Sequence, residues 1–191
     1  MDAFITSTVA VAIAEIGDKT QLLSLLLVAR YRKPWPILWA ILLATLLNHG
    51  LSAALGVSLS RFIEGDWLNI FLAFAFIAVG LWMLIPDSDD NLATDNRHHG
   101  VFLTTLVLFF IAEIGDKTQV ATVLLAARFE SVVAVTLGTT VGMLLANAPV
   151  LWLGNRFCRE LPLRAIHVSA SLLFILIGLW TLIAETRLFG G

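Results

Sequence analysis

The sequence predicts an all-α integral membrane protein with six transmembrane helices, arranged as two inverted three-helix repeats. Three observations lead to this fold class: an apolar composition, six long apolar segments, and a motif that occurs twice at a fixed distance. Hydrophobic residues make up 59% of the 191-residue chain, and charged residues make up 14%. Soluble domains are usually about 45–50% apolar and about 25% charged, so lipid is the expected solvent for most of this surface.

Six apolar segments are long enough to be membrane spans. A helix needs about 20 residues to cross a hydrocarbon core of roughly 30 Å. Backbone groups in lipid must be satisfied internally, and no segment alternates like a barrel strand, so each is predicted to be a helix. The segments cover residues 3–29, 35–58, 67–86, 101–127, 130–154 and 165–185.

The two halves of the chain are copies of one unit. The sequence AEIGDKTQ occurs at 14–21 and again at 112–119, an offset of 98 residues, and Gly-Leu-Trp recurs at the same offset at 80–82 and 178–180. A repeat of this kind governs the interpretation of the fold. We therefore divide the chain into a first repeat at 1–86, an acidic central loop at 87–100 and a second repeat at 101–191.

Three spans per repeat is an odd number, so the second copy must enter the membrane from the opposite side. This arrangement is an inverted-topology pair, the plan of many secondary transporters, in which the binding site lies near the bilayer midplane. Basic residues gather on the side of the central loop, seven against three on the other side. The positive-inside rule then predicts a cytoplasmic central loop and both termini outside.

Each copy of the motif places two carboxylates and one ammonium deep inside a span. Glu15 lies about 12 residues into the first segment, or roughly 18 Å at 1.5 Å per residue. A charged side chain at a helix centre costs about 2.5–3.5 kcal/mol on insertion scales, so these groups are expected to face the protein interior. The predicted metal ligands are Glu15, Asp18, Glu113 and Asp116.

The spacing within an unbroken helix extends these acids into a polar stripe. Glu15 and Asp18 are three residues apart and are neighbours on one helical face. Further polar residues continue the stripe as secondary ligands or pathway residues: Gln21 and Ser24 in the first copy, and Gln119 and Thr122 in the second. Gly17 and Gly115 lie inside the motif and either break the helix, freeing carbonyl oxygens as ligands, or only allow close helix packing.

The four carboxylates, with Lys19 and Lys117 as charge compensation, sum to −2 when all are ionised. A buried charge of −2 is unstable without compensation. One divalent cation or two protons neutralise it, and these are mutually exclusive occupants of one site. The pattern therefore favours exchange of a metal ion against protons.

The donors are carboxylates, amides and hydroxyls, an oxygen set that suits hard cations such as Ca²⁺, Mn²⁺ and Mg²⁺. No prosthetic group is predicted, and nucleic acid is excluded as a partner because the chain has no basic patch. Other polar residues allow two interpretations. Asn48, His49 and Asn147 either line the pathway or serve helix packing, and His98 and His99 lie in a loop that is solvated or binds metal.

The doubled Glu-Ile-Gly-Asp-Lys-Thr motif, three helices per copy and the short acidic central loop resemble the GDT-type cation:proton antiporter family. That family contains bacterial manganese exporters of the MneA type and Golgi manganese and calcium transporters. Both copies match its E-x-G-D-[KR]-[ST] signature, and the resemblance covers essentially the whole chain. It implies export of Mn²⁺, or of Ca²⁺ in some members, driven by protons across a bacterial inner membrane. The family's metal-binding acids correspond to Glu15, Asp18, Glu113 and Asp116.

Three other functions compete with this one. An exporter of cationic organic solutes such as amino acids would also use carboxylates, but the sequence supplies no anion-binding half. An intramembrane aspartyl protease pairs two aspartates on facing helices, and the extra acids and lysines here fit poorly with a dyad that shares one proton. A passive channel is the third, although inverted repeats favour alternating access. The sequence alone does not choose between Mn²⁺ and Ca²⁺.

Overall fold

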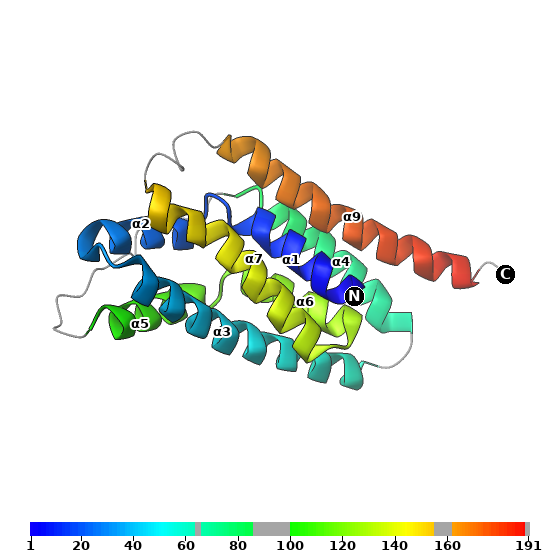
Figure 1. Ribbon diagram of the computed structural model, residues 1–191. Helices are drawn as coiled ribbons and strands as arrows, with labels where there is room; N and C mark the ends of the chain where they lie inside the picture. The colour runs from blue at the N-terminus through cyan, green and yellow to red at the C-terminus, as the bar shows by residue number, and fades with distance from the viewer. Residues whose placement is uncertain (64–65, 86–99, 155–161, 190–191) are drawn as a thin grey trace.

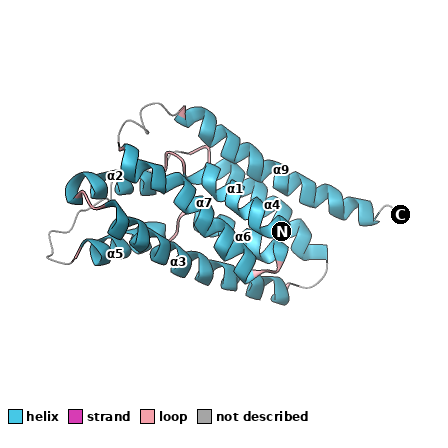
Figure 2. Ribbon diagram, in the orientation of Figure 1, coloured by secondary structure: helices cyan, strands magenta, loops and turns pink. Residues whose placement is uncertain are grey.

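The computed structural model describes residues 1–63, 66–85, 100–154 and 162–189, and all structural statements below concern that part of the chain. Its regular secondary structure is helical, and Figure 2 shows helices joined by short loops without a strand among the described residues. The all-α prediction is therefore confirmed.

The helices repeat in length and position along the two halves of the sequence. The first half forms α1 (Asp2–Glu15), α2 (Lys19–Tyr31), α3 (Pro34–Phe62) and α4 (Asp66–Trp82). The second half forms α5 (Val101–Glu113), α6 (Lys117–Phe129), α7 (Val132–Leu153) and α9 (Leu163–Phe189). Both α2 and α3 begin 98 residues before α6 and α7, so the sequence repeat is also a repeat of secondary structure.

Within the described ranges, three helices are individually long and apolar enough to cross a membrane: α3, α7 and the Leu163–Ala184 part of α9. Shorter apolar helices occur at Trp67–Trp82, within α4, and at Val101–Glu113, which is α5. The first and fourth predicted segments differ from the sequence expectation of single helices. Each is divided into two half-helices, α1 with α2 and α5 with α6.

Helices of one half pack mainly on helices of the other half. The most extensive contacts join α1 to α7, α4 to α9, and α3 to both α5 and α6. In Figure 1, α1 and α4 run from right to left and α3 runs back, whereas the matching α5 and α9 run from left to right and α7 runs back. Equivalent helices of the two halves thus run in opposite directions.

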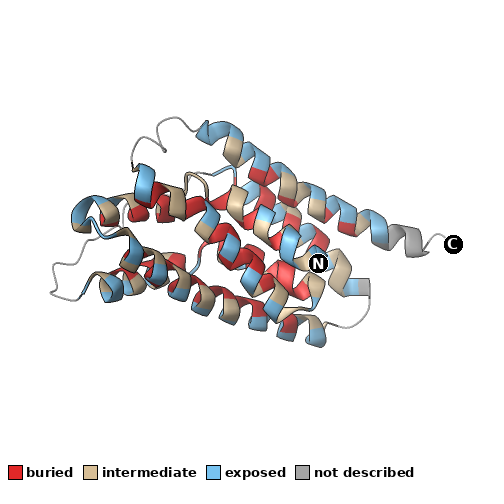
Figure 3. Cartoon of the chain, in the orientation of Figure 1, coloured by how far each residue is buried: buried red, intermediate tan, exposed pale blue. Residues whose placement is uncertain are grey.

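The distribution of polar and apolar side chains on α3 is typical of a helix with one face toward lipid and the other toward neighbouring helices. Its outward face carries leucines that are 39–65% exposed, at positions 43, 47, 51 and 55. Its inward face carries the buried polar residues Thr45, Asn48, His49 and Ser52. Figure 3 shows the same division across the bundle, with buried residues on the facing sides of the helices. Polar side chains inside and apolar side chains outside are typical of helices that associate within a membrane.

Small residues let the helices of the two halves approach closely. A Cβ atom at Gly138 would lie 2.6 Å from the carbonyl oxygen of Phe4, and one at Gly142 would lie 2.6 Å from that of Thr8. The matching residues Ala40 and Ala44 of α3 are fully buried. The two glycines thus allow α1 and α7 to approach closely, and the two alanines lie at equivalent buried positions of α3.

Candidate metal centre

Both copies of the motif interrupt their helix. The α1 helix ends at Glu15 and α2 begins at Lys19, and the second copy has the same break between Glu113 and Lys117. At the centre of each break the backbone turns through a positive φ, +86° at Gly17 and +76° at Gly115. Glycine adopts this conformation readily because it has no Cβ. The two glycines are therefore the residues at which the chain leaves the helix.

The expectation of one continuous polar stripe on each helix is wrong, because the helix does not continue through the motif. Glu15 is the last residue of α1, and Asp18 is the N-cap residue of α2. The two carboxylates of a copy therefore do not share a helical face. Each lies at a helix end instead: the glutamate at a C-terminus, and the aspartate at an N-terminus whose dipole favours negative charge.

The four secondary residues of the stripe make internal hydrogen bonds in this structure. Gly17 and Gly115 donate their backbone N–H groups to the amide oxygens of Gln21 and Gln119, at 3.0 and 2.7 Å. Both glutamines thereby satisfy donors that the helix breaks expose. Ser24 donates to the side-chain oxygen of Asn147 at 2.7 Å, and Thr122 donates to the carbonyl oxygen of Thr118 at 2.7 Å.

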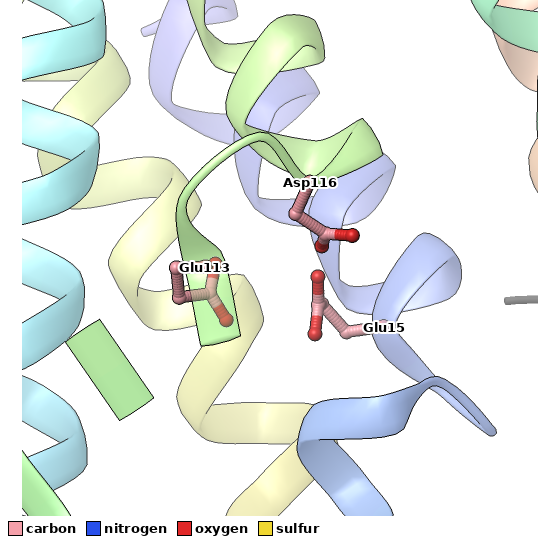
Figure 4. A group of neighbouring side chains, drawn as sticks. All are labelled: Glu15, Glu113 and Asp116. Atoms are coloured by element: carbon pink, nitrogen blue, oxygen red, sulfur yellow. The ribbon is translucent and has the colours of Figure 1, made fainter. Parts of the chain in front are cut away.

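Three of the four predicted acids converge on one point inside the bundle. Glu15, Glu113 and Asp116 each offer a carboxylate oxygen, and these atoms all lie within 4.8 Å of one another. Figure 4 shows the Glu15 carboxylate, from the end of α1, between the Glu113 and Asp116 carboxylates from the two sides of the second break. The exposed fractions are 0% for both glutamates and 2% for Asp116.

The three carboxylates differ in their hydrogen bonding. Glu15 accepts a hydrogen bond from the Thr20 hydroxyl at 2.6 Å through one oxygen. Asp116 forms an ion pair with Lys19 at 2.9 Å and accepts from the Thr118 hydroxyl at 3.0 Å. Among the described residues, the other Glu15 oxygen and both Glu113 oxygens accept no hydrogen bond. Three buried carboxylate oxygens are thus available to a cation.

His49 of α3 lies beside this cluster. Its Nε2 atom is 3.5 Å from a Glu113 carboxylate oxygen, and both residues are fully buried. Neither ring nitrogen has a hydrogen-bond partner in the described part of the chain. The sequence places a polar residue inside a span here, but its pattern does not separate a role at the site from a role in helix packing. Asn48, in contrast, donates to the carbonyl oxygen of Phe110 at 3.0 Å.

Asp18 and Lys117 lie outside the group of three acids. Both line a cavity of about 250 Å³ between the first break, the end of α4 and the start of α9, together with Lys19 and His167. Asp18 is half-buried, unlike its buried counterpart Asp116. Lys117 donates to the carbonyl oxygen of Ile85. The two copies of an identical motif therefore have different surroundings. The loop histidines His98 and His99 lie outside the described residues.

The model of one protein family matches nearly the whole chain. Residues 3–91 and 101–188 match the family model described as the divalent cation/proton antiporter GDT1. The chain belongs to the GDT1 family. The sequence resemblance is thus confirmed, and the competing protease interpretation is excluded, because the GDT1 family is a family of membrane antiporters and not of enzymes.

Relatives of this GDT1-family chain are found in bacteria and plants. It is 47% identical to a "Putative manganese exporter" of Vibrio cholerae over 182 residues, which cover 95% of this chain and 90% of the relative. It is 26% identical to GDT1-like protein 5 of Arabidopsis thaliana, with 96% of each chain covered. It is 25% identical to a GDT1-like protein of Synechocystis, covering 96% of this chain and 100% of the relative. No solved structure matches.

Proposed function

We propose that this protein exports Mn²⁺ in exchange for protons by alternating access, with Ca²⁺ as the alternative cargo. The observation that carries the proposal is the meeting of Glu15, Glu113 and Asp116 from both copies at one buried point. Membership of a divalent cation/proton antiporter family supports the exchange, and the 47% identical Vibrio cholerae relative supports manganese as the cargo.

The charge of the cluster supports a divalent ion and two protons as alternative occupants. Glu15, Glu113 and Asp116 carry three negative charges when ionised, and Lys19 contributes one positive charge through its ion pair with Asp116. The remaining charge of −2 is costly inside the bundle until it is neutralised. Because metal ligands must be deprotonated, a falling pH should weaken Mn²⁺ binding at the same oxygens.

We further propose that the six predicted segments all cross the bilayer as two inverted repeats. The opposite running directions of α1 and α5, α3 and α7, and α4 and α9 support this architecture (Figure 1). The broken helices also support it, since discontinuous spans with ion-binding helix ends at the midplane are typical of inverted-repeat transporters. The repeat boundaries remain those of the sequence: 1–86, the central loop at 87–100, and 101–191.

Within this architecture the protein lies in the bacterial plasma membrane, with a cytoplasmic central loop and both termini outside. The cavity that Asp18 and Lys117 line is then the route from the cytoplasm to the cluster. Lys19 and Lys117 compensate charge while the site is empty. Gln21, Ser24, Gln119 and Thr122 hold the broken helices and line the path.

The orientation is tested by labelling cysteines. We expect Asp2→Cys, in a Cys158→Ser background, to react with an impermeant maleimide added to intact cells, because the N-terminus is outside. A cysteine placed at Asn96 in the central loop serves as the matched control and should react only after permeabilisation. The reverse pattern would overturn the proposed orientation.

The transport function is tested in proteoliposomes. We expect vesicles with an acidic interior, diluted into alkaline medium, to take up Mn²⁺ faster than vesicles without a pH gradient. A parallel series with Ca²⁺ compares the two cargoes. Nigericin, which collapses the gradient, should remove the acceleration. An uptake rate that is the same with and without the pH gradient would contradict proton exchange. The absence of both Mn²⁺ and Ca²⁺ uptake would contradict the whole proposal.

A further inference from the structure

We propose that His49 is a direct ligand of the transported ion and selects Mn²⁺ over Ca²⁺. The inference rests on the proposed function, because it adds a nitrogen donor to the cluster of Glu15, Glu113 and Asp116. The motif itself supplies only oxygen donors. His49 lies in α3, 28 residues beyond the end of the first motif copy at Gln21.

The first observation is that His49 is buried without a hydrogen-bond partner among the described residues. A neutral imidazole carries one N–H donor and one nitrogen lone pair, and a buried polar group without a hydrogen bond costs about 1–3 kcal/mol. Both nitrogens of His49 lack a partner in the described part of the chain, although the residue is 0% exposed. A group bound to the lone pair would recover part of this cost.

The position of His49 is the second observation. Its Nε2 atom lies 3.5 Å from a Glu113 oxygen that accepts no hydrogen bond. Two ligand atoms about 2.1–2.6 Å from one ion and at right angles to each other are about 3.0–3.7 Å apart. The measured separation therefore suits two ligands of one ion, whereas it exceeds the usual length of a hydrogen bond.

The second copy of the repeat shows a different role for the residue at the equivalent position, namely helix packing. Asn147 occupies the position 98 residues after His49. Its amide oxygen accepts a hydrogen bond from the Ser24 hydroxyl at 2.7 Å, and its amide nitrogen donates to the carbonyl oxygen of Met143 at 3.1 Å. The equivalent position in α7 thus serves helix packing. In α3 the same position carries a larger side chain with a nitrogen lone pair beside the Glu113 carboxylate, and no hydrogen-bond partner among the described residues accounts for it.

The chemical consequence is selectivity. Ca²⁺ and Mg²⁺ take oxygen ligands, whereas first-row transition ions also accept imidazole nitrogen. Three carboxylates alone do not distinguish Mn²⁺ from Ca²⁺ by donor type. An imidazole in place of a fourth oxygen donor strengthens Mn²⁺ binding relative to Ca²⁺. The choice of cargo is thereby assigned to a residue outside the repeated motif.

The test combines electron spin echo spectroscopy of bound Mn²⁺ with competition binding. Protein purified without a polyhistidine tag is loaded with one equivalent of Mn²⁺. We expect nitrogen modulation from a coordinated imidazole in the wild type and its loss in His49→Gln. The chain contains four histidines, so a control with His98→Gln, His99→Gln and His167→Gln retains only His49 and should keep the modulation.

Competition with Ca²⁺ gives the second measurement. We expect His49→Gln to lower the preference for Mn²⁺ over Ca²⁺ about tenfold or more, since losing even an indirect partner of a metal site costs about 10–100-fold in affinity. Retained Ca²⁺ binding shows that the variant is folded. Bound Mn²⁺ without nitrogen modulation, or an unchanged preference in His49→Gln, overturns this inference alone. A wild type that binds neither ion overturns the proposed function.

Discussion

Glu113→Gln is expected to reduce Mn²⁺ transport about a hundredfold or more without unfolding the protein. Glu113 is fully buried, and neither of its carboxylate oxygens accepts a hydrogen bond from the described residues, so its negative charge is available to a cation. Glutamine has nearly the same shape but no charge. Leaving a buried charge without its partner costs about 3–5 kcal/mol, which corresponds to roughly two to three orders of magnitude in binding.

The measurement is initial Mn²⁺ uptake into proteoliposomes under a fixed pH gradient, with equal amounts of reconstituted protein. Glu130→Gln is the matched control, because Glu130 is an exposed carboxylate at the C-terminal end of α6. Its uptake should equal that of the wild type. If Glu113→Gln takes up Mn²⁺ at the same rate as the wild type, the buried cluster is not the transport site.

Aspartate variants test the asymmetry between the two copies, by equilibrium binding of Mn²⁺ to the purified protein and by the same uptake assay. Asp116 belongs to the cluster, whereas Asp18 lines the neighbouring cavity. We therefore expect Asp116→Asn to weaken equilibrium Mn²⁺ binding more than Asp18→Asn does. Both variants should slow transport, because Asp116 belongs to the cluster and an ion that reaches the cluster through the cavity passes Asp18. Equal binding losses would contradict the distinction that the structure makes between the two aspartates.

Gly17→Ala is expected to destabilise the protein more than Gly115→Ala. Both glycines have positive φ, and a left-handed conformation costs an L-residue about 1–2 kcal/mol. At Gly17 a Cβ atom would also lie 2.6 Å from a methyl carbon of Leu163, whereas at Gly115 it would meet no atom within 4 Å. Alanine therefore brings backbone strain at both positions, and at Gly17 it also requires the flexible side chain of Leu163 to move aside, which adds a smaller cost.

The apparent Tm in detergent measures this difference. At roughly 2–4 °C per kcal/mol for a chain of this size, we expect Gly115→Ala to lower the Tm by a few degrees and Gly17→Ala to lower it further. The double variant Gly17→Ala with Leu163→Ala removes the side chain that the new methyl group meets. The Tm of this double variant should lie below the Tm of Leu163→Ala by the same amount as the Tm of Gly115→Ala lies below that of the wild type. Equal Tm values for the two single alanine variants would contradict the steric part of the argument.

Much of this molecule can be predicted from its sequence. The apolar segments predict helices because lipid leaves no other partner for the backbone. Their outer bounds lie near helix ends, although the first and fourth segments are each divided into two helices. The eight-residue identity at 14–21 and 112–119 predicts equivalent elements in both halves. Charged residues within spans predict a buried site, since six such groups facing lipid would be too costly.

The sequence alone does not determine how the motif is arranged in space. Whether Gly17 stays in a helix or turns out of it depends on the packing around it, because glycine tolerates both conformations. Once the helix breaks, the glutamate and the aspartate of one copy belong to different helices. The polar stripe inferred from helical spacing therefore disappears, and both glutamines bond to the exposed backbone instead.

The sequence by itself determined a helical membrane protein with two equal copies of one acidic motif. Only the tertiary structure decided that Asp116 joins Glu15 and Glu113 while Asp18 faces a cavity, because identical sequences differ only in what packs around them. It also decided that His49 lies against Glu113. A residue on a separate helix reaches the motif only through the packing of α3 on α5, and such packing leaves no spacing pattern in the sequence.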